Sequence, residues 1–134
     1  MCYGVTMSNR NLYGTEAKER WGETDSYKIS SARTSKYTET DWQAQRAEQQ
    51  AAVDLFIEPM SAGLPVDSDE AAKAARAHRL QIDKWFYPCS YEMHSGLAEM
   101  YIADERFAKF YNDQADGLAQ YVRDAIIANA LKHL

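Results

Sequence analysis

The stretch Trp85–Phe107, WFYPCSYEMHSGLAEMYIADERF, decides the fold, because two helical patterns meet in it at Pro88. Proline lacks an amide hydrogen and pushes the preceding residue out of the α region, so one helix must end before Pro88. The hydroxyl of Ser90 can then accept a hydrogen bond from the first amides of a new helix. On that helix His94 and Tyr101, seven residues apart, share one face. The stretch therefore predicts a helix break followed by a helix with an aromatic face.

The face of this second helix has two interpretations. Tyr91 lies one turn before His94. An adjoining stripe consists of Met93, Leu97 and Met100. A wall of rings, thioethers and one imidazole suits a binding cleft better than a catalytic centre. The same spacing is also that of an ordinary core face, and spacing alone favours the core.

Length and composition describe one globular domain. The chain has 134 residues, enough for one core but not for two. No run approaches the roughly 20 apolar residues that span a bilayer, and the first residues lack the basic and apolar segments of a signal peptide. Cys2 and Cys89 are too few and too far apart for a disulfide framework. Reduced thiols in a cytoplasmic protein are the simplest account.

The charge pattern argues against several partners. The net charge is −5, and no lysine or arginine cluster is present that could follow a phosphate backbone. We therefore expect no direct binding of nucleic acid by this chain and no membrane association. As an isolated domain it is expected to be a monomer.

The first part of the chain has weaker patterns than the rest. Residues 1–11 show no periodic apolar pattern and are predicted to be a mobile tail before a single domain, residues 12–134. Residues 12–37 resemble two short helices separated by Gly22, which would be marginal alone. This segment either docks permanently on a stable helical core, residues 38–134, or is a lid that orders when a ligand arrives. Its aromatic residues, which need a surface to pack on, are Tyr13, Trp21, Tyr27 and Tyr37.

Firm helix signals follow. Thr38-x-x-Asp41 resembles a capping box and begins a long helix, with Pro59 near its end expected to kink or fray the last turn. Asp67-x-x-Glu70 signals the start of the next helix, where acidic residues are favourable against the helix dipole. That helix has an alanine-rich face, which would let another helix approach closely.

The remaining patterns complete an all-α prediction. His78 lies in the middle of the alanine-rich face, where a histidine is more often a hydrogen-bonded core residue than a ligand contact. Asp104 resembles the N-cap of a short helix, and Asp116 or a neighbour starts the last helix. Asn129 is the one polar residue on the buried side of that helix and must find a partner, either backbone or a polar atom of a ligand. No alternating strand pattern and no internal repeat occurs.

The sequence gives little support for a catalytic site or a metal site. His78, His94 and His133 are not at zinc-motif spacing, and no cysteine or acidic pair completes a ligand set, so we predict no metal site and no cofactor. Cys89 and His94 flank a helix start, where a thiol pKa can be lowered. No third group obviously orients the histidine, and acyl transfer would also need oxyanion donors. We therefore predict no catalytic residues.

Separate motifs occur in a fixed order over nearly the whole chain from Leu12 onward. Together they resemble the TipAS antibiotic-recognition domain. That domain is the effector-sensing half of certain MerR-type transcriptional activators, and it also occurs as a free-standing drug-binding protein. The motifs are Tyr13-Gly14-x-Glu16-Ala17-x-x-Arg20-Trp21-Gly22, Tyr37-Thr38-x-x-Asp41-Trp42, His78-Arg79, Tyr87-Pro88-Cys89-Ser90-Tyr91-Glu92-Met93-His94 with Leu97-Ala98-Glu99-Met100-Tyr101 and Asp104-Glu105-Arg106-Phe107, and Ile127-Ala128-Asn129-Ala130.

The resemblance implies a fold and a function. It implies a globin-like helical bundle without haem, with a ligand cleft between helices. It implies non-catalytic binding of bulky, heterocycle-rich antibiotics such as thiopeptides, for which aromatic faces and adaptable methionines are suitable. No helix-turn-helix and no sustained heptad pattern precedes the domain, so the chain is expected to be an isolated effector domain or a drug-sequestering short form. The alternative from another class is a helical interaction module whose groove holds a partner helix.

One position departs from the family pattern. The thiopeptide-trapping form carries a cysteine two residues after the motif histidine, and here that position is Gly96. Reversible binding is therefore expected in place of covalent capture. Gly96 either permits close helix packing or opens room for a larger ligand, at a cost of roughly 1 kcal/mol of helix stability relative to alanine. The predicted ligand-binding residues are Trp21, Tyr27, His78, Trp85, Cys89, Tyr91, Met93, His94, Gly96 and Tyr101.

Overall fold

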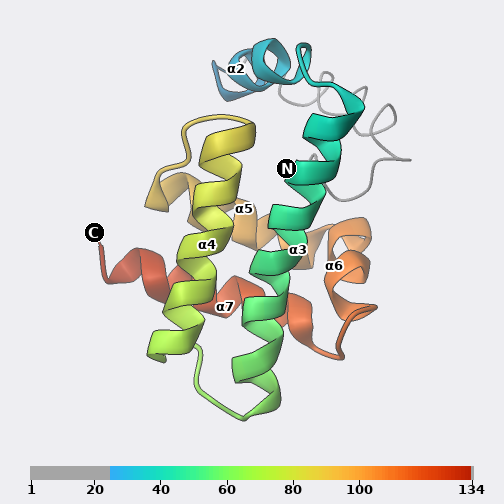
Figure 1. The fold of residues 1–134 in the computed structure, drawn as a ribbon. Coiled ribbons are helices and arrows are strands. Elements are labelled where there is room, and N and C mark those ends of the chain that lie inside the picture. Colours follow the sequence, from blue (N-terminus) through green and yellow to red (C-terminus); the bar gives the residue numbers. More distant parts are fainter. Residues whose placement is uncertain (1–24, 134) are drawn as a thin grey trace.

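The computed structural model describes residues 25–133, and within this range the chain forms helices and no strands (Figure 1). In Figure 1, α3 and α4 lie side by side and antiparallel, α5 and α7 cross behind them, and α2 lies across one end. The all-α prediction is confirmed. The helices are α2 (Asp25–Thr34), α3 (Glu39–Ser61), α4 (Asp69–Trp85), α5 (Tyr91–Ala103), α6 (Glu105–Asn112) and α7 (Leu118–Leu131).

Some of the predictions concern the part of the chain before residue 25. The predicted tail, residues 1–11, the first short helix and Trp21 lie outside the described residues. Between residues 25 and 133, no helix is both long and apolar enough to cross a membrane.

Three helix starts follow the sequence signals. The hydroxyl of Thr38 accepts from the Asp41 amide at 3.2 Å, and the Thr38 amide donates to the Asp41 carboxylate at 2.9 Å, which completes the predicted capping box of α3. The hydroxyl of Ser90 accepts from the Met93 amide at 3.1 Å and begins α5 after Pro88. A carboxylate oxygen of Asp104 accepts from the Arg106 amide at 3.0 Å and begins α6.

One helix start differs from the prediction, and the last helix begins next to Asp116 as predicted but with a cap from another helix. Ser68, and not Asp67, caps α4, by accepting from the Ala71 amide at 3.2 Å. The last helix begins after Gly117, whose φ of 79° is left-handed and favours glycine, and no side chain caps it at that residue. The side chain of Asn112, from the end of α6, accepts from the Ala119 amide at 3.0 Å. A tertiary contact therefore satisfies an amide for which the sequence suggested a local acidic cap.

The end of α3 tolerates a proline. Pro59 is buried inside the helix, which continues to Ser61. Gly63 follows with a φ of 74°, and the Leu64 amide donates to the Pro59 carbonyl at 2.9 Å. This is the hydrogen-bond pattern of a Schellman motif, so the chain turns sharply from α3 towards α4.

The core lies between α3, α4, α5 and α7. The alanine-rich face of α4 is buried, with Ala71, Ala74 and Ala75 at 0% exposure, so its neighbours approach closely as expected. Asn129 on α7 is 4% exposed, and its amide nitrogen has no acceptor among residues 25–133. The partner that this buried amide requires is therefore not supplied by the described part of the chain.

The helix α2 is joined to the core mainly at the end of α4. A guanidinium nitrogen of Arg33 donates to the Asp83 carbonyl at 2.7 Å, and the Tyr37 hydroxyl donates to the Trp85 carbonyl at 2.5 Å. The Tyr37 ring also packs edge-on against Trp85 at 5.5 Å and against Trp42 at 5.4 Å. Trp85 is therefore part of the junction between residues 25–37 and the rest of the described fold.

Candidate functional site

A chain of hydrogen bonds between three buried side chains lies at the centre of the molecule. Nδ1 of His78 on α4 is 2.9 Å from Nε2 of His94 on α5. Nε2 of His78 is 3.0 Å from the hydroxyl of Tyr111 on α6. All three residues are at most 1% exposed. The bond between two imidazoles needs one nitrogen that carries no proton, so at least one of the two rings is neutral. His78 is thus a hydrogen-bonded core residue, as its position on the alanine-rich face favoured.

Burial controls the protonation of these histidines. Loss of solvation lowers the pKa of His78 from 6.5 to about 4. Loss of solvation also lowers the pKa of His94 well below its ordinary value, and the nearby His78 and Arg79 lower it further. Because a proton on either ring is unfavourable here, the pair suits a structural role and not general acid–base catalysis near pH 7.

These pKa shifts predict a loss of stability in weak acid. Between pH 6.5 and 4 the folded state binds fewer protons than the unfolded state, so the free energy of unfolding falls as the pH falls through this window. At pH 5 His78 alone should contribute a loss of about 2 kcal/mol relative to pH 7.5. Urea unfolding at the two pH values measures it. His94→Gln should show a smaller fall, and equal unfolding free energies for the parent at both pH values would contradict the prediction.

Two further predicted ligand residues lie in the core. Tyr101 on α5 is 0% exposed, with its ring centroid 5.7 Å from His78 and 5.2 Å from Tyr111. Cys89 is 2% exposed, and its amide donates to the Asp83 carboxylate at 2.9 Å. Together with His78 and His94, these residues are buried in the core, and their assignment as ligand contacts stays a prediction.

Tyr91, at the start of α5, is held by two neighbours. The ring of His133 stacks on it at 4.3 Å with an interplanar angle of 5°, and the guanidinium carbon of Arg79 is 4.4 Å from its centroid. Two groups cannot occupy the same face at these distances, so they cover opposite faces of the ring. Tyr91 is half-buried, and a ligand that stacked on its face would displace one of these neighbours.

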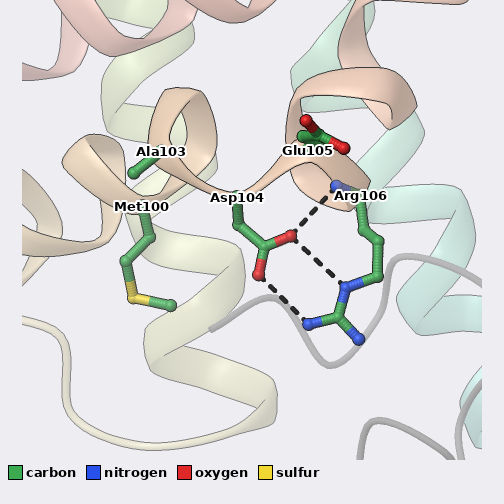
Figure 2. Close-up of a pocket in the computed structure, with 5 residues that line it drawn as sticks. All are labelled: Met100, Ala103, Asp104, Glu105 and Arg106. Atoms are coloured by element: carbon green, nitrogen blue, oxygen red, sulfur yellow. Dashed lines mark hydrogen bonds and ion pairs between the residues drawn. The ribbon is translucent and has the colours of Figure 1, made fainter.

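The corner between α5 and α6 contains a large open cavity. Its volume is about 610 Å³, within the usual range for ligand pockets. In Figure 2, the side chains of Met100, Asp104 and Arg106 extend to the same side of this corner. The lining residues are Met100, Ala103, Asp104, Glu105 and Arg106.

Asp104 fixes the arginine at this corner. One carboxylate oxygen accepts from the Arg106 amide at 3.0 Å and from Nε at 3.3 Å, and the other accepts from an Arg106 terminal nitrogen at 3.1 Å (Figure 2). The residue that ends α5 and caps α6 therefore also orients a planar cation at the cavity. A guanidinium held in this way can stack on flat rings and donate to carbonyl groups.

One face of α5 leads into the cavity. Gly96, Met100 and Ala103 are spaced at i, i+4 and i+7, and Met93 lies one turn before Gly96. Both methionines are half-buried, whereas Gly96 and Ala103 are exposed. The structure thus brings the predicted residues Met93 and Gly96 onto the surface that ends at the cavity. We call this surface the α5 stripe.

Sequence reasoning missed most of the cavity itself. The predicted ligand-binding residues do not include Ala103, Glu105 or Arg106, and Asp104 is predicted only as the N-cap of a helix. Helical spacing could have added Met100, which shares the face of Gly96. The corner residues become neighbours of the α5 stripe only because α5 ends at Asp104 and α6 turns away, which periodicity within one helix does not show.

The other predicted residues lie elsewhere. Tyr27 on α2 is half-buried and packs against the core. Trp85 is half-buried, and its indole nitrogen has no acceptor among residues 25–133. Within the same range, no three His, Cys, Asp or Glu side chains are grouped so that they could hold a metal ion.

No packing contact within residues 25–133 requires a glycine at position 96. It lies inside α5 with a backbone that any residue can adopt, since only Gly63 and Gly117 have positive φ in the described chain. A Cβ added at Gly96 would meet nothing within 4 Å in the described structure, apart from its own helix backbone and chain neighbours. The interpretation that Gly96 permits close helix packing is therefore wrong for residues 25–133. Room on the α5 stripe is the interpretation that remains.

The glycine should accordingly weaken the fold. We expect Gly96→Ala to raise the free energy of unfolding by about 0.5–1 kcal/mol, because alanine loses less backbone entropy in a helix. Thermal or urea unfolding measures the change. Gly117→Ala is the matched control, since its Cβ also meets nothing within 4 Å but its φ of 79° strains any side chain, so it should destabilise. A destabilised Gly96→Ala variant would mean that the helix needs this glycine.

Comparison with known proteins agrees with this architecture. The model of the TipAS antibiotic-recognition domain family matches residues 13–129. The HTH-type transcriptional activator TipA of Streptomyces coelicolor is 46% identical over 121 residues, which are 90% of this chain and 48% of that protein. The HTH-type transcriptional activator mta of Bacillus subtilis is 36% identical over 118 residues, which are 88% of this chain and 42% of that protein. The chain thus spans about half the length of the curated relatives it matches.

Solved structures agree as well. TipAS of Streptomyces lividans, solved in complex with nosiheptide as part of a thiopeptide antibiotic multidrug resistance system, superposes with a TM-score of 0.86 at 46% identity. The match covers 92% of this chain and 86% of that one. The antibiotic-binding domain of a TipA-class multidrug resistance transcriptional regulator matches with a TM-score of 0.63 at 46% identity, over 69% of this chain and 98% of that one. The predicted globin-like, all-α fold is confirmed.

Proposed function

The chain belongs to the TipAS antibiotic-recognition domain family, and from this premise we propose that it binds bulky, heterocycle-rich antibiotics of the thiopeptide kind. It is a ligand-binding regulatory domain and not an enzyme. The observation that carries the proposal is the match, over 92% of this chain, to a relative solved with nosiheptide bound.

We place the ligand on the α5 stripe and in the cavity at its end. The thioethers of Met93 and Met100 are flexible and polarizable, so they can adapt to ligands of different shape. The guanidinium of Arg106, held by Asp104, offers a flat cation to a heterocycle or a carbonyl group. Gly96 leaves the helix backbone open to a ring that lies flat on it. These groups provide area and orientation, and none of them needs to react.

We propose the role of the whole protein from its similarity to the relatives. A chain of this kind would sense drug as the effector half of a MerR-type transcriptional regulator, or sequester drug as a free-standing form. With a net charge of −5, this chain does not contact DNA itself, and DNA would be reached only through another part of a regulator. The isolated domain would act as a monomer in the cytoplasm.

Residues 12–37 are proposed to close over the ligand. The described part of this segment, residues 25–37, is joined to the core by two bonds to backbone carbonyls of α4, from Arg33 and Tyr37. Most of the residues of α2 are exposed or half-buried, so the helix buries little surface of its own. A ligand that touches Trp21 or Tyr27 as well as the α5 stripe would offset the cost of ordering this segment.

Titration with nosiheptide tests the site. Met100→Ala should weaken binding roughly tenfold, about 1.4 kcal/mol, because it removes a thioether from the cavity wall. Ile102→Ala is the matched control, since Ile102 is 38% exposed on a different face of the same helix and should change affinity less than twofold. Amide exchange of residues 12–37 in the same samples should slow when ligand binds. Equal affinities for the parent and Met100→Ala would place the ligand elsewhere.

Mass spectrometry tests whether binding is reversible. After incubation with a dehydroalanine-bearing thiopeptide and denaturation, the parent should keep its own mass, because Cys89 is 2% exposed and position 96 lacks a thiol. Gly96→Cys should gain the mass of one ligand, since the new S–H adds across the C=C bond with nothing lost. The control Ile102→Cys offers an exposed thiol outside the α5 stripe and should gain no adduct at equal exposure to ligand. An adduct on Cys89 of the parent would overturn the reversible mode.

A further inference from the structure

A second groove lies on the outer side of the pair α3 and α4, away from the α5 stripe. Its volume is about 280 Å³, and its floor is apolar, with Ala51 and Leu55 from α3 and Ala77 and Leu80 from α4. Leu80 is 48% exposed and adds to the apolar surface of the groove. Figure 1 shows α3 and α4 side by side, and the residues that line the groove come from these two helices.

A buried polar group opens into this groove. Gln81 lines it and is only 7% exposed. Its side-chain oxygen accepts from the Gln45 amide at 3.1 Å, while its own amide nitrogen donates to no acceptor among residues 25–133. Gln45 is 0% exposed and its own oxygen has no partner in the same range. The amide nitrogen of Gln81 is not one of the fully buried atoms without a partner, so it can donate a hydrogen bond to solvent or to a group that enters the groove.

The walls of the groove carry opposite charges. Glu48 lines it on α3 and Lys84 lines it on α4, and the two form an ion pair at 2.8 Å with 39% and 60% of their side chains exposed. The exposed Lys73, eleven residues before Lys84, lies on the same side of α4 and continues its basic side. Exposed ion pairs are weak, so Glu48 and Lys84 can exchange partners at little cost. The acidic wall on α3 and the basic wall on α4 therefore favour opposite charges on the two sides of a helix bound in the groove.

From these features we propose that the α3–α4 groove docks an amphipathic helix of a partner. The partner helix has one or two leucine-sized side chains for the alanine floor, basic residues towards α3, acidic residues towards α4, and one hydrogen-bond acceptor for Gln81. Small floor residues let a helix approach closely along a furrow, as a third helix does in a bundle. Opposite charges on the two flanks fix the direction of the helix, because a reversed helix would place like charges together.

The relatives indicate where such a helix could come from. The matched segment covers 48% of the HTH-type activator TipA and 42% of the activator mta, so those proteins hold a second part that can supply a helix to this domain. The inference rests on the proposed function only where it names that second part of a regulator as the source of the docking helix. The groove and its charges are properties of this chain.

The test uses an 18-residue acetylated and amidated peptide that carries this pattern, with ¹⁵N-labelled protein observed by amide spectra. Saturable shifts are expected at Ala51, Ala77 and the side chain of Gln81. Leu80→Glu should weaken binding at least tenfold, and Ala51→Lys, at an exposed position of the floor, should do the same. Ile102→Glu, which puts the same charge on an exposed isoleucine of α5, should bind within twofold of the parent. A peptide of the same composition with its leucines dispersed should give no saturable shift.

Several outcomes would overturn the proposal. One is saturation of shifts at another surface. The others are peptide binding by Leu80→Glu and Ala51→Lys that is as strong as that of the parent, or binding of the dispersed peptide that is as strong as that of the patterned one. Shifts of α3 and α4 that grow with protein concentration alone would assign the groove to a second copy of the chain. Nosiheptide titration of Leu80→Glu separates this inference from the proposed function, because that variant should bind the drug within twofold of the parent whether or not the peptide binds.

Discussion

The hydrogen-bonded chain of His78, His94 and Tyr111 is the constraint on which the rest of the structure depends. It joins α4, α5 and α6 through groups that are almost completely buried, where an unpaired imidazole or hydroxyl would be costly. The chain therefore fixes how α5 is rotated about its axis. With His94 and Tyr101 turned inward, the helix has to present Met93, Gly96 and Met100 at its outer side. The surface proposed to bind ligand is thus determined by polar contacts in the core behind it.

The contacts at the helix ends constrain the arrangement of the helices as strongly as the core does. Asp104 terminates α5, caps α6 and holds Arg106 at the cavity, so one carboxylate sets both the corner and the cation that faces it. Asn112 caps the start of α7 from a distance, which ties the far end of α6 to the next helix. Because these connections are short and each is satisfied by a named side chain, the cavity is formed by rigid elements more than by a loop.

Sequence reasoning predicted the elements better than the site. Pro88, Ser90 and the pair Thr38 and Asp41 act locally, so their effect on helix boundaries can be read from neighbouring residues. The sequence predicts the start of α7 near Asp116 but not the residue that caps it, because that residue is Asn112 on another helix. On α5, spacing showed that His94 and Tyr101 share a face but not whether that face meets a ligand or the core. Only the partners on α4 and α6 decide that question, and they are far away in sequence.

The division of α5 into two faces also separates stability from specificity. Changes at His94 or Tyr101 disturb a packed and hydrogen-bonded core, whereas a side chain at position 96 meets no described neighbour within 4 Å. A family that recognises different drugs can therefore vary the outer face of this helix without rebuilding the fold. The cysteine expected from the family pattern at position 96 and the glycine found there are two solutions at such a position. The glycine is expected to lower the stability of the helix and leaves its backbone open, which agrees with the proposed binding of a ligand without a covalent bond.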